Sequence, residues 1–169
     1  MYYLLVLVAA ASRIMPHPPN VAPVAALGLF AGAYSQRRSS WAIPLVGLLI
    51  ADAFIGFYNP LVMAFVYAGF AATGVLGKLF LKDRRSPVRI GAVSLAGSLA
   101  FFLLSNFGVW AAGMYPRTMS GLIQCYVMGI PFFWNTLAGD LFYSAVLFGL
   151  YEASLSYSAR KKQMEAIGG

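Results

Sequence analysis

The chain has few of the side chains that most often carry chemistry. It contains one cysteine, Cys125, one histidine, His17, and five acidic residues in a length of 169. A single cysteine excludes an intramolecular disulfide and any metal framework built from cysteines. Cys125 and His17 together are also too few for a structural zinc site, which takes four ligands.

Charge is scarce as well, and the phosphate-binding pattern Gly-x-x-x-x-Gly-Lys-Ser/Thr does not occur. Only 10% of the residues are charged and 60% are hydrophobic, whereas soluble proteins have about 25% charged residues. The mean hydropathy is +0.74. These values indicate an integral membrane protein. Because the phosphate-binding pattern is missing, any ATP hydrolysis must belong to a partner.

The basic residues are clustered rather than spread. Ten of the twelve lie in three groups, and only Arg13 and Arg117 fall outside them. Lys/Arg-rich loops stay on the cytoplasmic side of a bilayer, so the groups mark three cytoplasmic faces. The net charge of the whole chain, +7, is expected to meet anionic lipid headgroups, which argues against nucleic acid as a partner. The three groups are Arg37 with Arg38, Lys78 to Arg89, and Arg160 to Lys162.

Between the basic groups lie apolar segments, which we expect to be helical because a bilayer offers no water to an open backbone. We predict an all-α polytopic membrane bundle, a single domain over residues 1–169 with six transmembrane helices and both termini in the cytoplasm. Three of the segments are shorter than the roughly 20 residues that cross a bilayer. The predicted spans are Met1 to Met15, Val21 to Tyr34, Trp41 to Phe57, Pro60 to Leu81, Val88 to Trp110 and Pro131 to Tyr157.

Small residues recur at helical spacing and predict closely packed helices. Examples are Gly28 and Gly32 in the second span and Gly97 in the fifth. The run from Ala9 to Ser12 is the best candidate for docking to a partner membrane subunit.

This topology leaves three outward segments, and two of them are unlike ordinary connectors. Residues 15–20 contain three prolines, which impose a stiff, extended path that either caps a pocket or simply separates two helices. The segment Ala111 to Ile130 reads as a turn at Met114 to Thr118 followed by a short helix, Met119 to Ile130, that ends at Pro131. Irregular backbone at membrane depth survives where it lines a cavity, so this segment is expected to line one.

Two acids, Asp52 and Asp140, lie inside apolar segments, toward the outer half of the predicted spans. A charge at that depth costs about 2.5–3.5 kcal/mol on insertion scales, so each acid should face the bundle interior with a partner. Arg13 and Arg117 are the cations on that side, and a structural salt bridge to one of them is one interpretation. The other is that an acid receives a polar or cationic part of a ligand.

Cys125 and His17 both fall on the outer side. Thiolate and imidazole are good ligands for soft metals, including a metal held in an organic ring. We therefore predict that the two face one outward cavity and that at least one of them contacts the ligand, without a protein-bound metal. The alternative for Cys125 is a small apolar filler, and a catalytic pair would require the two side chains to meet and the thiol pKa to fall.

Amide and aromatic residues gather at the same outer ends. An interfacial aromatic belt accounts for part of this pattern, above all Trp110 and Tyr115. Amides beside aromatic rings, however, are typical of a small-molecule pocket, which is mostly apolar with a few placed polar groups. The predicted substrate-binding residues are His17, Asn20, Asp52, Tyr58, Asn59, Asn106, Trp110, Arg117, Cys125, Tyr126, Asn135 and Asp140.

Several outer-side motifs carry a family resemblance that covers most of the chain. The chain resembles an uncharacterised family of bacterial six-helix integral membrane proteins, which is similar to the S-components, the substrate-binding subunits of energy-coupling factor vitamin transporters. The motifs are Pro16-His17-Pro18-Pro19-Asn20, Pro23-Val24-Ala25-Ala26-Leu27, Ser105-Asn106-Phe107-Gly108-Val109-Trp110, Cys125-Tyr126 and the stretch from Ile130 to Asp140.

The resemblance implies a substrate-capture subunit in the bacterial cytoplasmic membrane, with an outward pocket capped by the first, third and fifth loops. It also implies a vitamin-like or cofactor-like substrate and a partner energising module with a separate ATPase. A cobalamin transporter of that group binds the corrinoid cobalt through a cysteine, so a corrinoid held by Cys125 is one form of the hypothesis. The alternatives are a membrane-integral enzyme or redox protein using Cys125 and His17, and a scaffold protein without a ligand; we favour the transporter component over an enzyme.

The topology is testable by labelling. In a Cys125→Ser background, a cysteine placed at Ser39 or Ser86 should resist an impermeant thiol reagent in intact cells, because the basic groups hold those loops inside. A cysteine placed at Thr118 should be labelled. Labelling at Ser86 without labelling at Thr118 would invert the topology and remove the outward pocket.

Overall fold

The computed structural model describes residues 2–14, 20–35 and 39–168, and within these ranges every regular element is helical. The predicted all-α class is confirmed, and the described residues form six α-helices. The helices are α1 (Tyr2–Ile14), α2 (Val24–Tyr34), α3 (Ile43–Ile55), α4 (Pro60–Phe80), α5 (Pro87–Ala111) and α6 (Met119–Gly168), with a short 3-10 helix, η1 (Ser40–Ala42), before α3.

The starts of α4 and α5 follow from local sequence. Each begins with proline at the first helical position, where the missing N–H costs nothing. Asn59 caps α4 by accepting hydrogen bonds from the backbone N–H groups of Leu61 and Val62, at 3.0 and 3.3 Å. Ser86 caps α5 in the same way from the N–H of Arg89.

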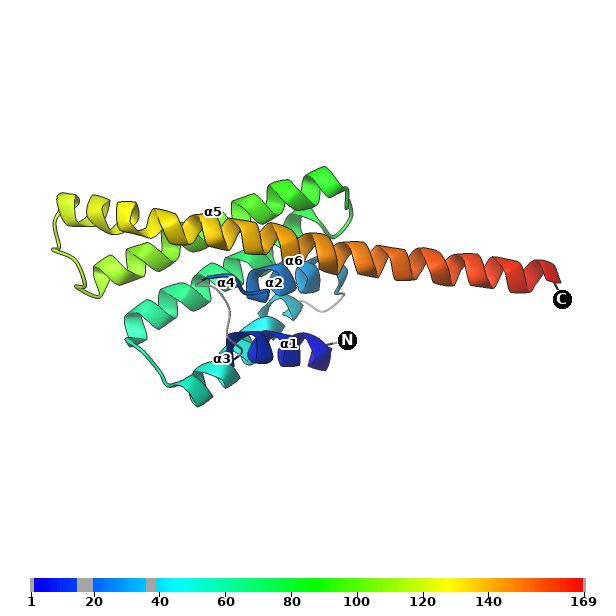
Figure 1. Cartoon of the computed structure of the whole chain (residues 1–169), viewed down its shortest axis with the longest axis horizontal. Helices are drawn as coiled ribbons and strands as arrows, with labels where there is room; N and C mark the ends of the chain where they lie inside the picture. The colour runs from blue at the N-terminus through cyan, green and yellow to red at the C-terminus, as the bar shows by residue number, and fades with distance from the viewer. Residues whose placement is uncertain (1, 15–19, 36–38, 169) are drawn as a thin grey trace.

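The six helices are arranged around α2. As Figure 1 shows, α4, α5 and α6 run alongside one another, with α2 packed against α4 and α6. The pair α1 and α3 packs together on the side away from α5. The bundle is therefore built in layers, with α2 in the middle.

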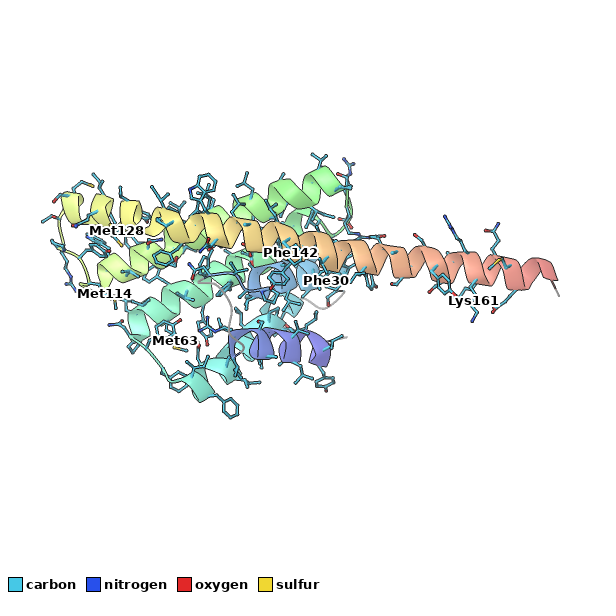
Figure 2. The ribbon with its side chains drawn as sticks, in the orientation of Figure 1. Phe30, Met63, Met114, Met128, Phe142 and Lys161 are labelled. Carbon is cyan, nitrogen blue, oxygen red and sulfur yellow. The ribbon has the colours of Figure 1, made fainter. Side chains whose placement is uncertain are left out.

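Helix α2 forms the core because it is apolar on every side. All ten residues from Val24 to Ala33 are buried, and a helix without a polar face is stable only when it is enclosed. Phe30 packs edge-on against Phe148 and Tyr151 of α6, with ring centroids 5.4 and 5.3 Å apart. Figure 2 shows Phe30 at this position, between the ribbons of α2 and α6.

Helices α2 and α4 approach closely through glycines. A methyl carbon added at Gly32 would lie 2.7 Å from the backbone nitrogen of Lys78, and one added at Gly77 would lie 2.8 Å from the Cα of Leu29. Neither position has room for a side chain. The small-residue pattern in the sequence therefore does report helix packing, as predicted.

The alanine run in α1 is used inside the chain. Ala9 and Ala10 are buried, and a methyl carbon added at Gly47 of α3 would lie 2.8 Å from the Cβ of Ala9. The expectation that this run docks a partner subunit is therefore wrong for Ala9 and Ala10, because α3 covers them.

Helix α6 is one continuous helix of 50 residues with Pro131 inside it. The prediction that a short helix ends at Pro131 is wrong. Residues on both sides of the proline are held by α5: Tyr126 donates a hydrogen bond of 2.8 Å to the carbonyl of Leu103, and the Phe133 ring lies 5.1 Å from the Phe102 ring. Packing on a common neighbour keeps the two halves of α6 in line despite the lost hydrogen bond.

The last part of α6 leaves the bundle. Every residue from Glu152 to Glu165 is exposed, and in Figure 1 this part projects beyond all the other helices. Lys161, labelled in Figure 2, lies on the projecting part with the third basic group.

Two of the described helices, α4 and α5, are long and apolar enough to cross a bilayer. Helices α1, α2 and α3 are apolar but have only 11 to 13 residues. Length and composition thus support membrane association directly for two helices.

The glycine contacts predict that Gly→Ala substitutions at packed and at open positions change the stability in opposite directions. Gly32→Ala or Gly77→Ala should lower the free energy of unfolding by about 1–3 kcal/mol, because the added methyl overlaps backbone that cannot move away. Gly149→Ala is the matched control: a methyl carbon there has nothing within 4 Å, and alanine favours helix by about 1 kcal/mol over glycine. Thermal unfolding in detergent measures the effect, and equal stability of all three variants would show that α2 and α4 are not in close contact.

Candidate functional site

Two adjoining cavities lie between α4, α5, α6 and the segment that leads into α2. The polar cavity, of about 210 Å³, includes Arg13, Tyr58 and Asp140 in its lining. The aromatic cavity, of about 240 Å³, includes Asn106 and several rings. Both are lined by Asn20, Val66, Phe101 and Thr136, so they form one site with a polar part and an aromatic part.

Asp140 is the buried acid of the polar cavity. Its side chain is 2% exposed, and its Oδ2 accepts a hydrogen bond of 2.7 Å from the Ser98 hydroxyl. Among the described residues no cation pairs with it. Ser98 lies 11 residues from the start of α5 and 13 from its end, so Asp140 lies beside the middle of α5, whereas the sequence interpretation placed it toward the outer half of its predicted span.

Asp52 has a different environment. The guanidinium of Arg13 contacts it at 2.7 Å, and the hydroxyl of Tyr67 donates a second hydrogen bond of 2.8 Å. The ion pair joins α1 to α3, and the hydrogen bond from Tyr67 joins α4 to them. The salt bridge that the sequence suggested for one acid is therefore confirmed for Asp52 with Arg13. Arg13 also lines the polar cavity, which puts a cation on one side of it and the Asp140 carboxyl on another.

Asn20 is placed at the junction of the two cavities by its backbone. Its φ angle is +62°, in the left-handed region that asparagine tolerates better than other residues with side chains. This turn leads the chain into α2 while Asn20 itself lines both cavities. Asn20, the last residue of the segment predicted to face outward, thus contributes to the site.

The aromatic cavity is walled mainly by rings of α5 and α6. Phe101 packs on Phe70 with ring centroids 4.5 Å apart, and Phe102 packs on Phe133. Asn106 donates from its Nδ2 to the carbonyl of Phe102, at 2.9 Å, and lines the cavity. This is the anatomy of a small-molecule site, apolar with a few polar groups.

Sequence reasoning missed several lining residues. Thr136, Val66 and Phe101 line both cavities but lie inside ordinary apolar segments, where nothing distinguishes them from lipid-facing neighbours. Tyr67, which holds Asp52, was also missed. Its position in α4 gave no signal, because aromatic residues are common in membrane helices.

Cys125 lies behind the site and lines neither cavity. It is 1% exposed, and its thiol donates to the backbone carbonyl of Asn106 at 3.3 Å. This placement is the one expected of a small buried filler. His17, the other half of the predicted pair, lies outside the described residues.

Four other predicted residues use their polar groups on the backbone. Besides the cap made by Asn59, Trp110 donates to the carbonyl of Pro116 at 3.1 Å, Arg117 donates to that of Ala111 at 3.2 Å, and Tyr126 donates to that of Leu103. Trp110 and Arg117 hold the turn between α5 and α6, Tyr126 ties α6 to α5, and Asn59 holds the start of α4. The pairing of Arg117 with a buried acid is therefore wrong. Asn135, half-buried on α6, is not among the residues that line the two cavities.

Of the eleven predicted residues that lie within the described ranges, four line the cavities: Asn20, Tyr58, Asn106 and Asp140. Asp52 reaches the site indirectly, through Arg13. Within the described ranges, no group of three or more His, Cys, Asp or Glu side chains is placed to hold a metal ion.

Comparison with known proteins gives one match. The sequence model of a family described as a family of unknown function, DUF6580, matches residues 1–164. Neither a curated protein nor a solved structure matches the chain.

The different surroundings of the two acids predict different effects of neutralising them. Asp52→Asn should destabilise the protein by about 3 kcal/mol, because it leaves Arg13 without its countercharge. Asp140→Asn should change stability by less than about 1 kcal/mol, since asparagine keeps an acceptor for Ser98 and removes a buried charge. Thermal unfolding in detergent compares the two variants, and a larger loss for Asp140→Asn would reverse the assignment.

Proposed function

We propose a function for this chain, which belongs to the DUF6580 family, a family of unknown function. It is a membrane-embedded subunit that captures a small vitamin-like or cofactor-like molecule. The single observation that carries the proposal is the joint cavity, in which a buried carboxyl, amides and aromatic rings line one space. Asn20, Tyr58, Asn106, Thr136 and Asp140 are the polar residues that meet the ligand.

The six-span arrangement in the bacterial cytoplasmic membrane, with both termini inside, belongs to the proposal. It is supported by the large apolar side chains that the bundle exposes, such as Leu7 at 65%, Phe54 at 79% and Phe142 at 62%. Apolar surface of this extent is stable against lipid and not against water. The short helices α1, α2 and α3 cross with the help of burial against the longer ones and of local thinning of the bilayer.

The cavity indicates a compact ligand with a flat apolar part and a hydrogen-bond donor. The two adjoining volumes, of about 210 and 240 Å³, are each smaller than a usual small-molecule site of about 300–1,000 Å³, and only together do they reach the lower part of that range. The rings of Phe101, Phe102 and Phe133 suit the flat part, and Asp140 suits a donor or cationic group. The corrinoid form of the hypothesis is weaker than the general one, because Cys125 lies outside the lining and supplies no metal ligand there.

Capture is the step that these residues perform. The ligand exchanges water for rings and for the carboxyl of Asp140, whose partner Ser98 holds the carboxyl in place. Release of the ligand into the cell requires energy. This chain has no phosphate-binding loop with which to use ATP as the source. An energising membrane module with a separate ATPase is therefore the proposed partner.

The proposal predicts that ligand retention depends on Asp140 and not on Cys125. Protein purified in mild detergent should carry a bound small molecule that native mass spectrometry detects. Asp140→Asn should reduce its occupancy at least tenfold, as expected for the loss of a charge-assisted hydrogen bond of about 1.5–3 kcal/mol. Cys125→Ala is the control and should retain the ligand.

Two results would contradict the proposal. The first is wild-type protein that is folded and free of any small molecule after exposure to a cell extract. The second is a ligand that Asp140→Asn retains fully while Cys125→Ala loses it, which would restore the cysteine-based site.

A further inference from the structure

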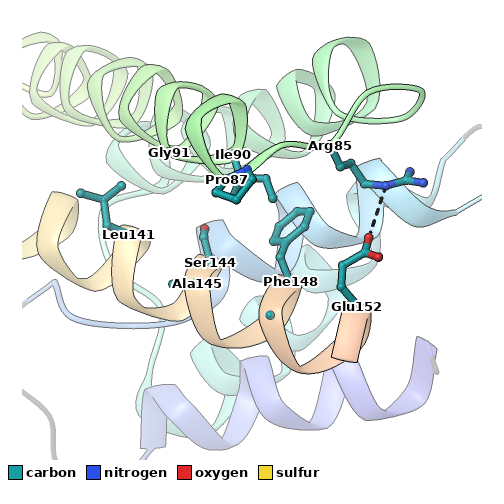
Figure 3. Close-up of a pocket in the computed structure, with 10 residues that line it drawn as sticks. Arg85, Pro87, Ile90, Gly91, Leu141, Ser144, Ala145, Phe148 and Glu152 are labelled. Carbon is teal, nitrogen blue, oxygen red and sulfur yellow. Dashed lines mark ion pairs between the residues drawn. The ribbon is translucent and has the colours of Figure 1, made fainter. Parts of the chain in front are cut away.

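A second hollow lies between α5 and α6, at the end of the bundle near the basic segment 78–89. This inner groove has a volume of about 410 Å³ and is lined by Arg85, Pro87, Ile90 and Gly91 on one side and by residues of α6 on the other. Figure 3 shows Leu141, Ser144 and Phe148 of α6 facing Pro87 and Ile90 of α5, with Arg85 and Glu152 at one end. It shares no lining residue with the two cavities of the candidate site.

The walls of the groove are apolar and its side is open. Methyl carbons added at Gly91 and Gly149 would meet nothing within 4 Å, and Ala145 and Leu141 are exposed. The one hydroxyl in the lining, that of Ser144, is already paired with the Ser94 hydroxyl at 2.8 Å. The groove therefore offers an occupant contact area and no hydrogen-bonding groups below its charged end.

The depth of the groove matches one leaflet of a bilayer. Its lining on α6 runs from Glu152, at the charged end, to Leu141, at the other end. Eleven residues of helix rise about 16 Å, which is about half of the 30 Å of hydrocarbon in a bilayer. A groove of this depth, open to the side, takes an acyl chain of a single leaflet.

The mouth of the groove carries a positioned cation. Arg85 donates to the backbone carbonyls of Ala33 and Lys82, and its guanidinium carbon lies 4.5 Å from the centre of the Tyr34 ring. Its ion pair with Glu152 is long, with 3.7 Å between Arg85 Nε and Glu152 Oε1, and Glu152 also accepts a hydrogen bond from the Tyr34 hydroxyl. Arg85 is thus fixed at the mouth mainly by carbonyls and a ring, and 31% of its side chain remains exposed.

We propose that the inner groove binds one anionic phospholipid of the cytoplasmic leaflet, with an acyl chain between α5 and α6 and the phosphate group at Arg85. The proposal rests on the membrane placement in the proposed function and not on the outer ligand. The basic segment 78–89 holds five Lys or Arg residues against one acid, Asp83, which complements an anionic headgroup. Basic pockets between membrane helices are known to select such headgroups.

A transmembrane helix of a partner is the competing occupant of a groove lined by glycine and alanine. A partner helix would explain the small residues. It would not explain the positively charged mouth, because a membrane helix does not need a negative group at this position. The charge at the mouth and the one-leaflet depth favour the lipid.

The first test blocks the groove. Purified protein in detergent is titrated with phosphatidylglycerol or with phosphatidylcholine of the same chains, and bound lipid is counted by native mass spectrometry. Wild type should bind one phosphatidylglycerol in preference to phosphatidylcholine, and Ala145→Leu, which fills the groove, should abolish that single bound lipid. Ala138→Leu is the matched control, an exposed alanine of the same helix outside the groove, and should bind as wild type.

The second test separates headgroup recognition from fold stability. Arg85→Gln should weaken phosphatidylglycerol binding about fivefold, the effect of one basic residue near an anionic surface, and leave phosphatidylcholine unchanged. Glu152→Gln removes the acid that competes for Arg85 and should strengthen phosphatidylglycerol binding. Arg84→Gln, which changes an exposed neighbour outside the groove, should weaken phosphatidylglycerol binding less than Arg85→Gln does. Equal weakening by Arg85→Gln and Glu152→Gln would mean that the pair is structural, and it would overturn the headgroup assignment.

The outcomes distinguish the possible failures. Phosphatidylglycerol binding that Ala145→Leu leaves unchanged places the lipid elsewhere and overturns the proposal. A folded Ala145→Leu variant that keeps its lipid but loses a co-purifying membrane protein assigns the groove to a partner helix. Neither result bears on the outer ligand, whose loss or retention is set by Asp140.

Discussion

The buried hydrogen bonds between α5 and α6 are the interaction on which the rest of the arrangement depends. Ser98 binds the carboxyl of Asp140, and one turn away along each helix Ser94 binds Ser144. In an apolar surrounding these groups have no water to return to, so parting the helices costs more than the packing alone. These two hydrogen bonds also separate the cavities from the groove. Asp140 lines the polar cavity, and Ser144 lines the inner groove.

The two acids inside the helices show how burial assigns different roles to the same side chain. Asp52 meets a full positive charge and a phenol, and it has become part of the scaffold that joins α1, α3 and α4. Asp140 meets a single hydroxyl in a cavity wall, which leaves its hydrogen-bonding capacity partly unused by the described residues. A charge without a counterion inside a bundle is costly to keep, and such residues usually mark a functional site.

Much of the fold could be predicted from the sequence, because apolar length and basic clusters report directly on helices. The expected spans from Pro60 to Leu81 and from Val88 to Trp110 agree with α4 and α5 within one residue at each end. The failure at Pro131 has a clear cause: a local helix-breaking signal was overruled by packing of both flanks on α5. The sequence alone does not show which residues pack on a neighbouring helix, so this compensation could not be predicted from it.

The site was predictable only in part, for a related reason. Asn20, Tyr58, Asn106 and Asp140 stood out because polar groups are rare in apolar surroundings, and all four line the cavities. Trp110, Arg117, Tyr126 and Asn59 stood out equally, yet their polar groups satisfy nearby backbone. Residue type cannot separate the two uses, since both require a polar group at the same depth. The pairing of Cys125 with His17 remains a prediction, with only the cysteine inside the described residues.

The continuity of α6 couples regions that a jointed chain would leave independent. About 20 residues, or 30 Å of helix, separate Asp140 from the basic group at Arg160 to Lys162, and no break in the helix lies between them. A helix of this kind transmits torque: a turn of its projecting end about the helix axis also turns Asp140 and Thr136 in the cavity wall. The orientation of these cavity-lining residues is thus coupled to a part of α6 that extends well beyond the bundle.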